Sequence, residues 1–205
     1  AEINKKIEKL IWQGDTTLTT NPDLKWINGL LVQLNADTDV IDVAIAYGTS
    51  AYNSILQTYM ALPEEVLERG GVIFVSPSLY RSFIQDMVNK NFFHYSGPQD
   101  AAPEEFVFPG SDVKVVKTPG LAGANYTVGT FADNLVYGTD MESDDEDIYI
   151  EYERKAKVFH LTVTWASGIA YYFPNLIVLG TIGAYLCAAG EWAFTAQNMA
   201  AGLYG

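Results

Sequence analysis

The stretch "LPEEVLERGGVIFVSPSLYRSF", residues 62–83, predicts a short helix, a buried strand and a second helix in direct succession. Pro63 suits the first position of a helix, two glutamates follow it in the first turn, and Gly70 is a typical stop. The continuous apolar run "VIFVS" indicates a buried strand. Ser76 can cap the next helix, which Pro77 opens. We therefore expect a buried strand between two helices.

The same stretch predicts a local hydrophobic core. Apolar residues recur at helical spacing in the second helix, which runs through Leu79, Phe83, Ile84, Met87 and Val88. We expect four side chains to be buried together where the strand meets this helix: Phe74, Leu79, Phe83 and Ile84.

Upstream of this unit, the chain is expected to begin inside a helix with one apolar stripe. The stripe consists of Ile3, Ile7, Leu10 and Ile11. The segment "KWINGLLVQL", residues 25–34, resembles a strand interrupted by Gly29, where a bulge or a close backbone approach is expected. Residues 40–46 form a second possible strand. Ser50 then caps a predicted helix that ends before Pro63 and carries Tyr52, Ile55, Leu56, Tyr59 and Met60.

Downstream, the chain becomes rich in strands. We expect strands at residues 106–118, 126–131, 148–152 and 158–165, mostly in antiparallel sheets. The charged turn "YERKAKV" joins the last two as a hairpin. The first overlaps "FPGSDVKVVKTPGL", residues 108–121, in which an alternating run of apolar and polar residues lies between two Pro-Gly pairs. The predicted fold class is α+β, with antiparallel sheets and flanking helices.

Composition excludes some functions. The 205-residue chain carries 25 acidic and 12 basic residues, so its formal charge of −13 opposes binding to nucleic acid phosphates. Its low charged fraction of 18 % leaves apolar surface that favours permanent partner contacts. Cys187 is the only cysteine, which rules out an internal disulfide and suggests a small buried hydrophobe. Residues 1–10 form a charged amphipathic pattern, so export is not expected.

Residues that could perform catalysis are scarce. His94 and His160 are the only histidines, and no nucleophile elbow, P-loop or dinucleotide fingerprint occurs. The outward position of His160 on an alternating strand argues against a ligand role. We therefore predict no enzyme activity, no catalytic residue and no cofactor.

One acidic segment carries a possible metal site. Acidic residues occupy positions 1, 3, 5, 7 and 12 of an EF-hand-like loop: Asp140, Glu142, Asp144, Glu146 and Glu151. Asp145 replaces the glycine that the sharp turn needs, and the following residues resemble a strand. A solvated acidic turn or an inter-subunit charge patch is the favoured interpretation.

Five stretches together resemble the major capsid protein of tailed bacteriophages. They are "IEKLIWQGD" (residues 7–15), "INGLL" (27–31), residues 62–83, residues 108–121, and "NLVYGTDMESDDEDIYIEY" (134–152) followed by "VTWASGIAYYFPNLIVL" (163–179). In order, they are similar to the end of the family's spine helix, the segment after it, the helix-strand-helix of the axial domain, a strand leading to the peripheral domain, and the closing strands. The collective order, and no single motif, carries the resemblance.

The resemblance implies a domain organisation. It places the end of the spine helix and a peripheral segment in residues 1–47, a mainly axial domain in 48–131 and closing strands in 132–179. Residues 180–205 form an apolar tail without a counterpart. Family members carry an N-terminal arm and an extended hairpin ahead of the spine helix, so we expect this chain to be a fragment that folds but does not build shells alone.

The resemblance also implies a function. The chain would tile an icosahedral shell through pentamers and hexamers around double-stranded DNA, in a virion assembled in the bacterial cytoplasm. Scaffold, protease, portal and decoration proteins would be its partners, with no membrane and no sequence-specific nucleic acid binding. Two alternatives stay open: an encapsulin-type nanocompartment shell, and a calcium-dependent binding module that uses the acidic loop.

Overall fold

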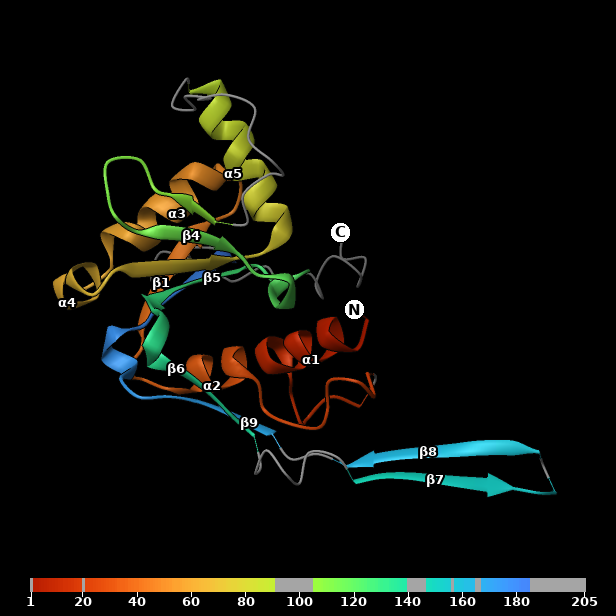
Figure 1. Ribbon diagram of the computed structural model, residues 1–205. Coiled ribbons are helices and arrows are strands. Elements are labelled where there is room, and N and C mark those ends of the chain that lie inside the picture. The colour runs from red at the N-terminus through yellow and green to blue at the C-terminus, as the bar shows by residue number, and fades with distance from the viewer. Residues whose placement is uncertain are drawn as a thin grey trace, which may run out of the picture.

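A mixed six-stranded sheet forms the centre of the molecule (Figure 1). The computed structural model describes residues 2–19, 21–90, 105–139, 147–155, 157–164 and 167–184. The strands lie in the order β1 (Ile41–Ala46), β10 (Val178–Ala184), β5 (Tyr126–Phe131), β2 (Gly71–Val75), β4 (Lys114–Lys117) and β3 (Glu105–Val107). The pairs β1–β10 and β2–β4 are parallel, whereas the other pairs in this sheet are antiparallel. The α+β class is confirmed, and most pairs are antiparallel as predicted, but the two parallel pairs make this sheet mixed.

Helices cover both faces of the sheet. In Figure 1, α3 (Ala51–Met60) and α5 (Pro77–Asn89) lie on one side, and α1 (Glu2–Gln13) and α2 (Leu30–Ala36) lie on the other. The short helix α4 (Glu64–Glu68) precedes β2 and packs on the same face as α3. Strand alternation sends successive side chains to opposite faces, so each face has its own buried cluster. Residues of the α3 cluster include Ile55, Val66, Ile73, Phe83 and Val115, and those of the α1 cluster include Trp12, Leu30, Leu34, Val128 and Leu179.

The helix starts follow their predicted caps. The Ser50 side chain accepts a hydrogen bond from the backbone N–H of Asn53, and Ser76 accepts one from that of Leu79. Gly70 ends the α4 segment with a φ of +82°, a conformation that glycine adopts without strain. The predicted helix-strand-helix of residues 62–83 is therefore confirmed.

Residues 25–34 do not form the predicted strand. Their second half begins α2 instead, because Leu30, Leu31 and Leu34 recur at helical spacing and all three are buried. The close backbone approach at Gly29 is confirmed. Its N–H donates to the carbonyl of Gly14 at 2.8 Å, and a Cβ at Gly29 would lie 2.6 Å from the Gly14 nitrogen.

The strand predicted at residues 106–118 is two strands. A turn separates β3 from β4, where the N–H of Phe108 donates to the carbonyl of Val113 and Gly110 has a φ of +79°. The Pro-Gly pair inside the predicted strand makes this turn, because glycine adopts a positive φ and proline cannot donate to a ladder.

The core prediction for the strand and α5 is correct in part. Phe83 is fully buried, whereas Leu79 and Ile84 are half-buried beside it. Phe74 packs in the opposite cluster, where its ring centroid lies 5.4 Å from that of Trp12, because alternation points it away from α5. Met60 and Val88, which the sequence analysis counted among the apolar residues of α3 and α5, are exposed.

Two two-stranded ribbons complete the described chain. β6 (Leu135–Thr139) pairs with β9 (Ser167–Tyr171), and β7 (Asp147–Glu153) pairs with β8 (Val158–Thr164). The second ribbon confirms the hairpin predicted around the charged turn. Short 3-10 helices occur at η1 (Pro119–Leu121), η2 (Ala132–Asn134) and η3 (Pro174–Leu176). Within the described ranges, no helix has the length and apolar character needed to cross a bilayer.

Candidate assembly surfaces

The β7–β8 hairpin extends away from the helices and the six-stranded sheet (Figure 1). Its register sets apolar residues opposite one another at every second position: Ile148 opposite Val163, Ile150 opposite Leu161, and Tyr152 opposite Phe159. Apolar residues of the two strands are therefore paired with one another along the length of the ribbon. An isolated two-stranded ribbon is marginally stable in water, so a hairpin of this composition favours contact with a further surface.

The tip of this hairpin is basic. Arg154, Lys155 and Lys157 are all exposed at the turn, in a chain that has only 12 basic residues and a net charge of −13. Lys157 has a φ of +54°, the left-handed conformation that closes a tight turn. The hairpin therefore presents a positive end in a chain whose net charge is negative.

Exposed aromatic side chains lie near the β6–β9 ribbon. Tyr137 belongs to β6, and Tyr172 and Phe173 follow β9, with their ring centroids 6.3 Å apart. Tyr172 is 66 % exposed, although aromatic rings are usually buried or at interfaces. These rings add apolar surface beside the β6–β9 ribbon. The β7–β8 hairpin lies between β6 and β9 in the sequence.

A Pro-Gly corner fixes β4 to α1. After β4, the N–H of Gly120 donates to Glu8 Oε1 at 3.1 Å, and Gln13 Nε2 donates to the Gly120 carbonyl at 2.6 Å. A Cβ at Gly120 would overlap Trp12 and lie 2.6 Å from the carbonyl oxygen of Glu8. Only glycine fits this approach, so the stretch of residues 108–121 joins the sheet rigidly to the first helix.

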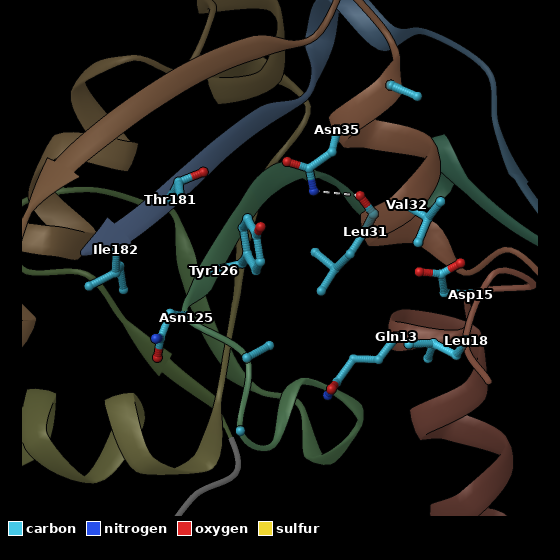
Figure 2. Close-up of a pocket in the computed structure, with 13 residues that line it drawn as sticks. Gln13, Asp15, Leu18, Leu31, Val32, Asn35, Asn125, Tyr126, Thr181 and Ile182 are labelled. Atoms are coloured by element: carbon cyan, nitrogen blue, oxygen red, sulfur yellow. Dashed lines mark hydrogen bonds between the residues drawn. The ribbon is translucent and has the colours of Figure 1, made fainter. Parts of the chain in front are cut away.

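A groove opens between the end of α1, α2, the start of β5 and the end of β10 (Figure 2). It has a volume of about 700 Å³. Leu31 on α2 and Tyr126 on β5 lie on opposite sides, and Ile182 on β10 contributes a further apolar wall. Asp15 stands at the α1 end, where hydrogen bonds from the side chain and backbone of Thr17 hold the pKa of its carboxyl below its ordinary value.

The acidic, histidine and cysteine residues that the sequence analysis considered as ligands or catalytic groups do not form a site within the described residues. Asp140, Glu142, Asp144 and Glu146 lie outside the described residues, as do His94 and Cys187. Glu151 is exposed on β7, opposite His160 in the register. Among the residues that the structure describes, no group of three or more His, Cys, Asp or Glu side chains could hold a metal ion.

Comparisons by sequence find no matching family model and no matching curated protein. Comparison of structures finds a chain of the satellite phage P4 procapsid that includes the size determination (Sid) protein, with a TM-score of 0.56 and 13 % identity. The match covers 88 % of this chain and 63 % of that one. A virus-like particle from Pyrococcus furiosus matches with a TM-score of 0.49 and 11 % identity over 87 % of this chain and 64 % of that one.

This chain thus spans less than two thirds of the length of either structure. The likeness to the procapsid chain shows a capsid-type fold. Sequence reasoning located these candidate surfaces only in part. The hairpin was predicted from its charged turn, whereas the groove left no local signal because residues from four separate elements line it.

Proposed function

We propose that this protein is a structural subunit that self-associates into a closed shell. The projecting β7–β8 hairpin is the observation that carries the proposal. It offers a ribbon in which apolar residues of the two strands are paired, together with a basic tip, on a body whose fold is similar to that of a procapsid chain. Repeated contacts of this kind between identical subunits can close into rings when each hairpin reaches the next copy.

The charge distribution supports association between copies. The three exposed basic residues of the tip would meet acidic surface on a neighbouring copy, for example the exposed Glu64, Glu65 and Glu68 of α4. Opposite charges steer such encounters and fix their register, and salt weakens them. The paired apolar residues of the ribbon would add burial, which supplies most of the free energy of a permanent interface.

At finer detail, we propose the major capsid protein of a tailed bacteriophage. The resemblance of the five sequence stretches supports this assignment, with pentamers and hexamers enclosing double-stranded DNA in a virion made in the bacterial cytoplasm. A surface with a charge of −13 would bind DNA weakly, which suits a container that must fill and empty. Scaffold, maturation protease, portal and decoration proteins would be partners, and catalysis would have no role.

The domain organisation is part of the same proposal. Residues 1–47 would hold the end of the spine helix and a peripheral segment, 48–131 the axial domain, and 132–179 the closing strands. The Gly120 corner would then connect the axial sheet to the spine helix.

The tip charge provides the test. Sedimentation velocity of the purified chain over a range of concentrations should show association that weakens with added salt. Arg154→Glu with Lys155→Glu should weaken it at least about tenfold, since close charge pairs at interfaces couple strongly. Lys25→Glu with Arg81→Glu is the matched control, because both residues are exposed and the net charge changes equally.

Two outcomes would contradict the proposal. Equal weakening of association by both double variants would show that the effect comes from net charge alone. A wild-type chain that stays monomeric at every concentration would show that the protein does not self-associate. Native particles then decide the finer assignment. Packaged double-stranded DNA supports a phage capsid, whereas a defined protein cargo supports a nanocompartment.

A further inference from the structure

The groove in Figure 2 has walls suited to an apolar peptide segment. Leu31, Tyr126 and Ile182 supply apolar surface, and the side-chain amides of Gln13 and Asn35 line the same space. The nitrogen of the Asn35 amide donates to the carbonyl of Leu31 at 2.6 Å. That of Gln13 donates to the carbonyls of Gly120 and Ala122. Each amide thus keeps its side-chain oxygen as an acceptor for an incoming backbone N–H.

The chain continues directly from the wall of this groove. Ile182 lines the groove, β10 ends at Ala184, and residues 185–205 follow. Fourteen of these 21 residues are apolar and only Glu191 carries a charge, in the sequence "YLCAAGEWAFTAQNMAAGLYG". A segment with so few charges and so many apolar side chains does not have the composition of a solvated tail.

We propose that the segment of residues 185–205 docks into this groove of its own chain. Cys187 follows Ile182 by five residues, so at about 3.3–3.6 Å per residue an extended chain reaches about 17 Å from the wall. That reach lets the first residues of the segment enter the groove without a long loop. A second copy would have to bring the same segment to the groove at the cost of association entropy, so the intramolecular route is favoured.

The dimensions of the groove define what it holds. A volume of about 700 Å³ accommodates a few large side chains and their backbone, and not all 21 residues. Tyr185 and Leu186 lie closest along the chain to the apolar walls, and the amide oxygens of Gln13 and Asn35 can accept their backbone N–H groups. The proposal concerns one chain alone, and it does not depend on shell formation.

Cys187 makes the proposal testable because it is the only cysteine in the sequence. A second cysteine is introduced in the full chain at Ala36 or at Asn125, which line the groove from α2 and from the start of β5. Disulfides form when the two Cα atoms come within about 4.4–6.8 Å. Glu65→Cys on α4 is the control, because this exposed position lies on the other face of the sheet.

Under mild oxidation, at least one groove variant should form an intramolecular disulfide at least about tenfold faster than the Glu65→Cys control, as a tethered pair at high effective concentration would. Adding Cys187→Ser should abolish the product, and thiol counting with non-reducing gels measures it. If neither groove variant exceeds the control, the segment does not dock. If the groove variants instead give disulfide-linked dimers, the groove takes the segment of a second copy, and the intramolecular proposal is wrong.

Discussion

At the scale of single residues, Gly120 shows how one missing side chain can join two parts of a fold. Its N–H and its carbonyl both bond to side chains of α1, from Glu8 and Gln13. This contact is possible because the backbone of η1 approaches the helix closely enough for Trp12 and the Glu8 carbonyl to occupy the space of a Cβ. The sequence shows a Pro-Gly pair after the predicted strand, but the partner helix is more than a hundred residues away along the chain and could not be predicted locally.

We predict that Gly120→Ala lowers the free energy of unfolding by about 1–3 kcal/mol, because the added methyl group forces α1 and η1 apart. Chemical denaturation measures the change. Gly168→Ala is the matched control, because a Cβ at Gly168 would meet no atom within 4 Å. The control should stay within about 0.5 kcal/mol of wild type. Equal stability of the two variants would contradict the close contact between η1 and α1.

Phe83 is a second residue whose contribution to stability depends on its environment. It is 0 % exposed, and its ring stacks with Tyr52 and Phe108 and meets the edge of Phe106. Phe83→Ala should lower the free energy of unfolding by about 3–5 kcal/mol through lost contacts and a residual cavity. Val88→Ala on the same helix, at an exposed position, should cost less than about 1 kcal/mol. A loss below about 1 kcal/mol for Phe83→Ala would show that this face of α5 is misplaced.

At the scale of elements, local signals predicted helices with side-chain caps and failed where tertiary contacts decide. Ser50 and Ser76 cap their helices through bonds to residues three positions on, so the sequence alone contains both partners. α2 has no side-chain cap bond at Gly29 and is only seven residues long, so burial of its three leucines against the sheet stabilises it. The preceding Trp and Ile residues gave that segment the composition of a strand.

Side-chain hydrogen bonds join α2 to the β6–β9 ribbon, and one of them comes from an ionisable group. The Tyr171 hydroxyl on β9 donates to Asp37 Oδ2, in the residue that caps the C-terminus of α2, at 2.8 Å. Burial, followed by this bond and the Asp37 charge, raises the pKa of Tyr171 to about 12 from an ordinary 10.0. Because the folded state holds this proton more tightly than the unfolded state, the stabilisation is fully present below pH 10 and is lost as pH rises toward about 12.

We therefore expect Tyr171→Phe to be less stable than wild type at pH 8 and to show a smaller loss of stability between pH 10 and 12. Urea denaturation midpoints at several pH values measure both effects. Tyr172→Phe, at the exposed neighbouring residue, should keep the wild-type slope. If the slope of Tyr171→Phe matched that of wild type, the bond to Asp37 would not govern this titration.

At the scale of the whole molecule, the order of the strands in the sheet could not be predicted from the sequence. The charged turn predicted the β7–β8 hairpin, because its two strands are adjacent in the sequence. The bounds of β5 follow from its composition. The parallel pair β1–β10 joins residues 41–46 to residues 178–184, and no local pattern records such a partner. The same limit applies to the groove, where α1, α2, β5 and β10 each contribute only a few residues.

The pairing of β1 with β10 has a consequence for biosynthesis. β1 is synthesised before its only partner strand among the described residues, which is made about 140 residues later. At about 5–20 residues per second this is a delay on the order of ten seconds. Throughout that interval the nascent chain carries an unpaired strand edge, which can pair with other chains. The complete six-stranded sheet therefore forms only after nearly the whole described chain has been synthesised.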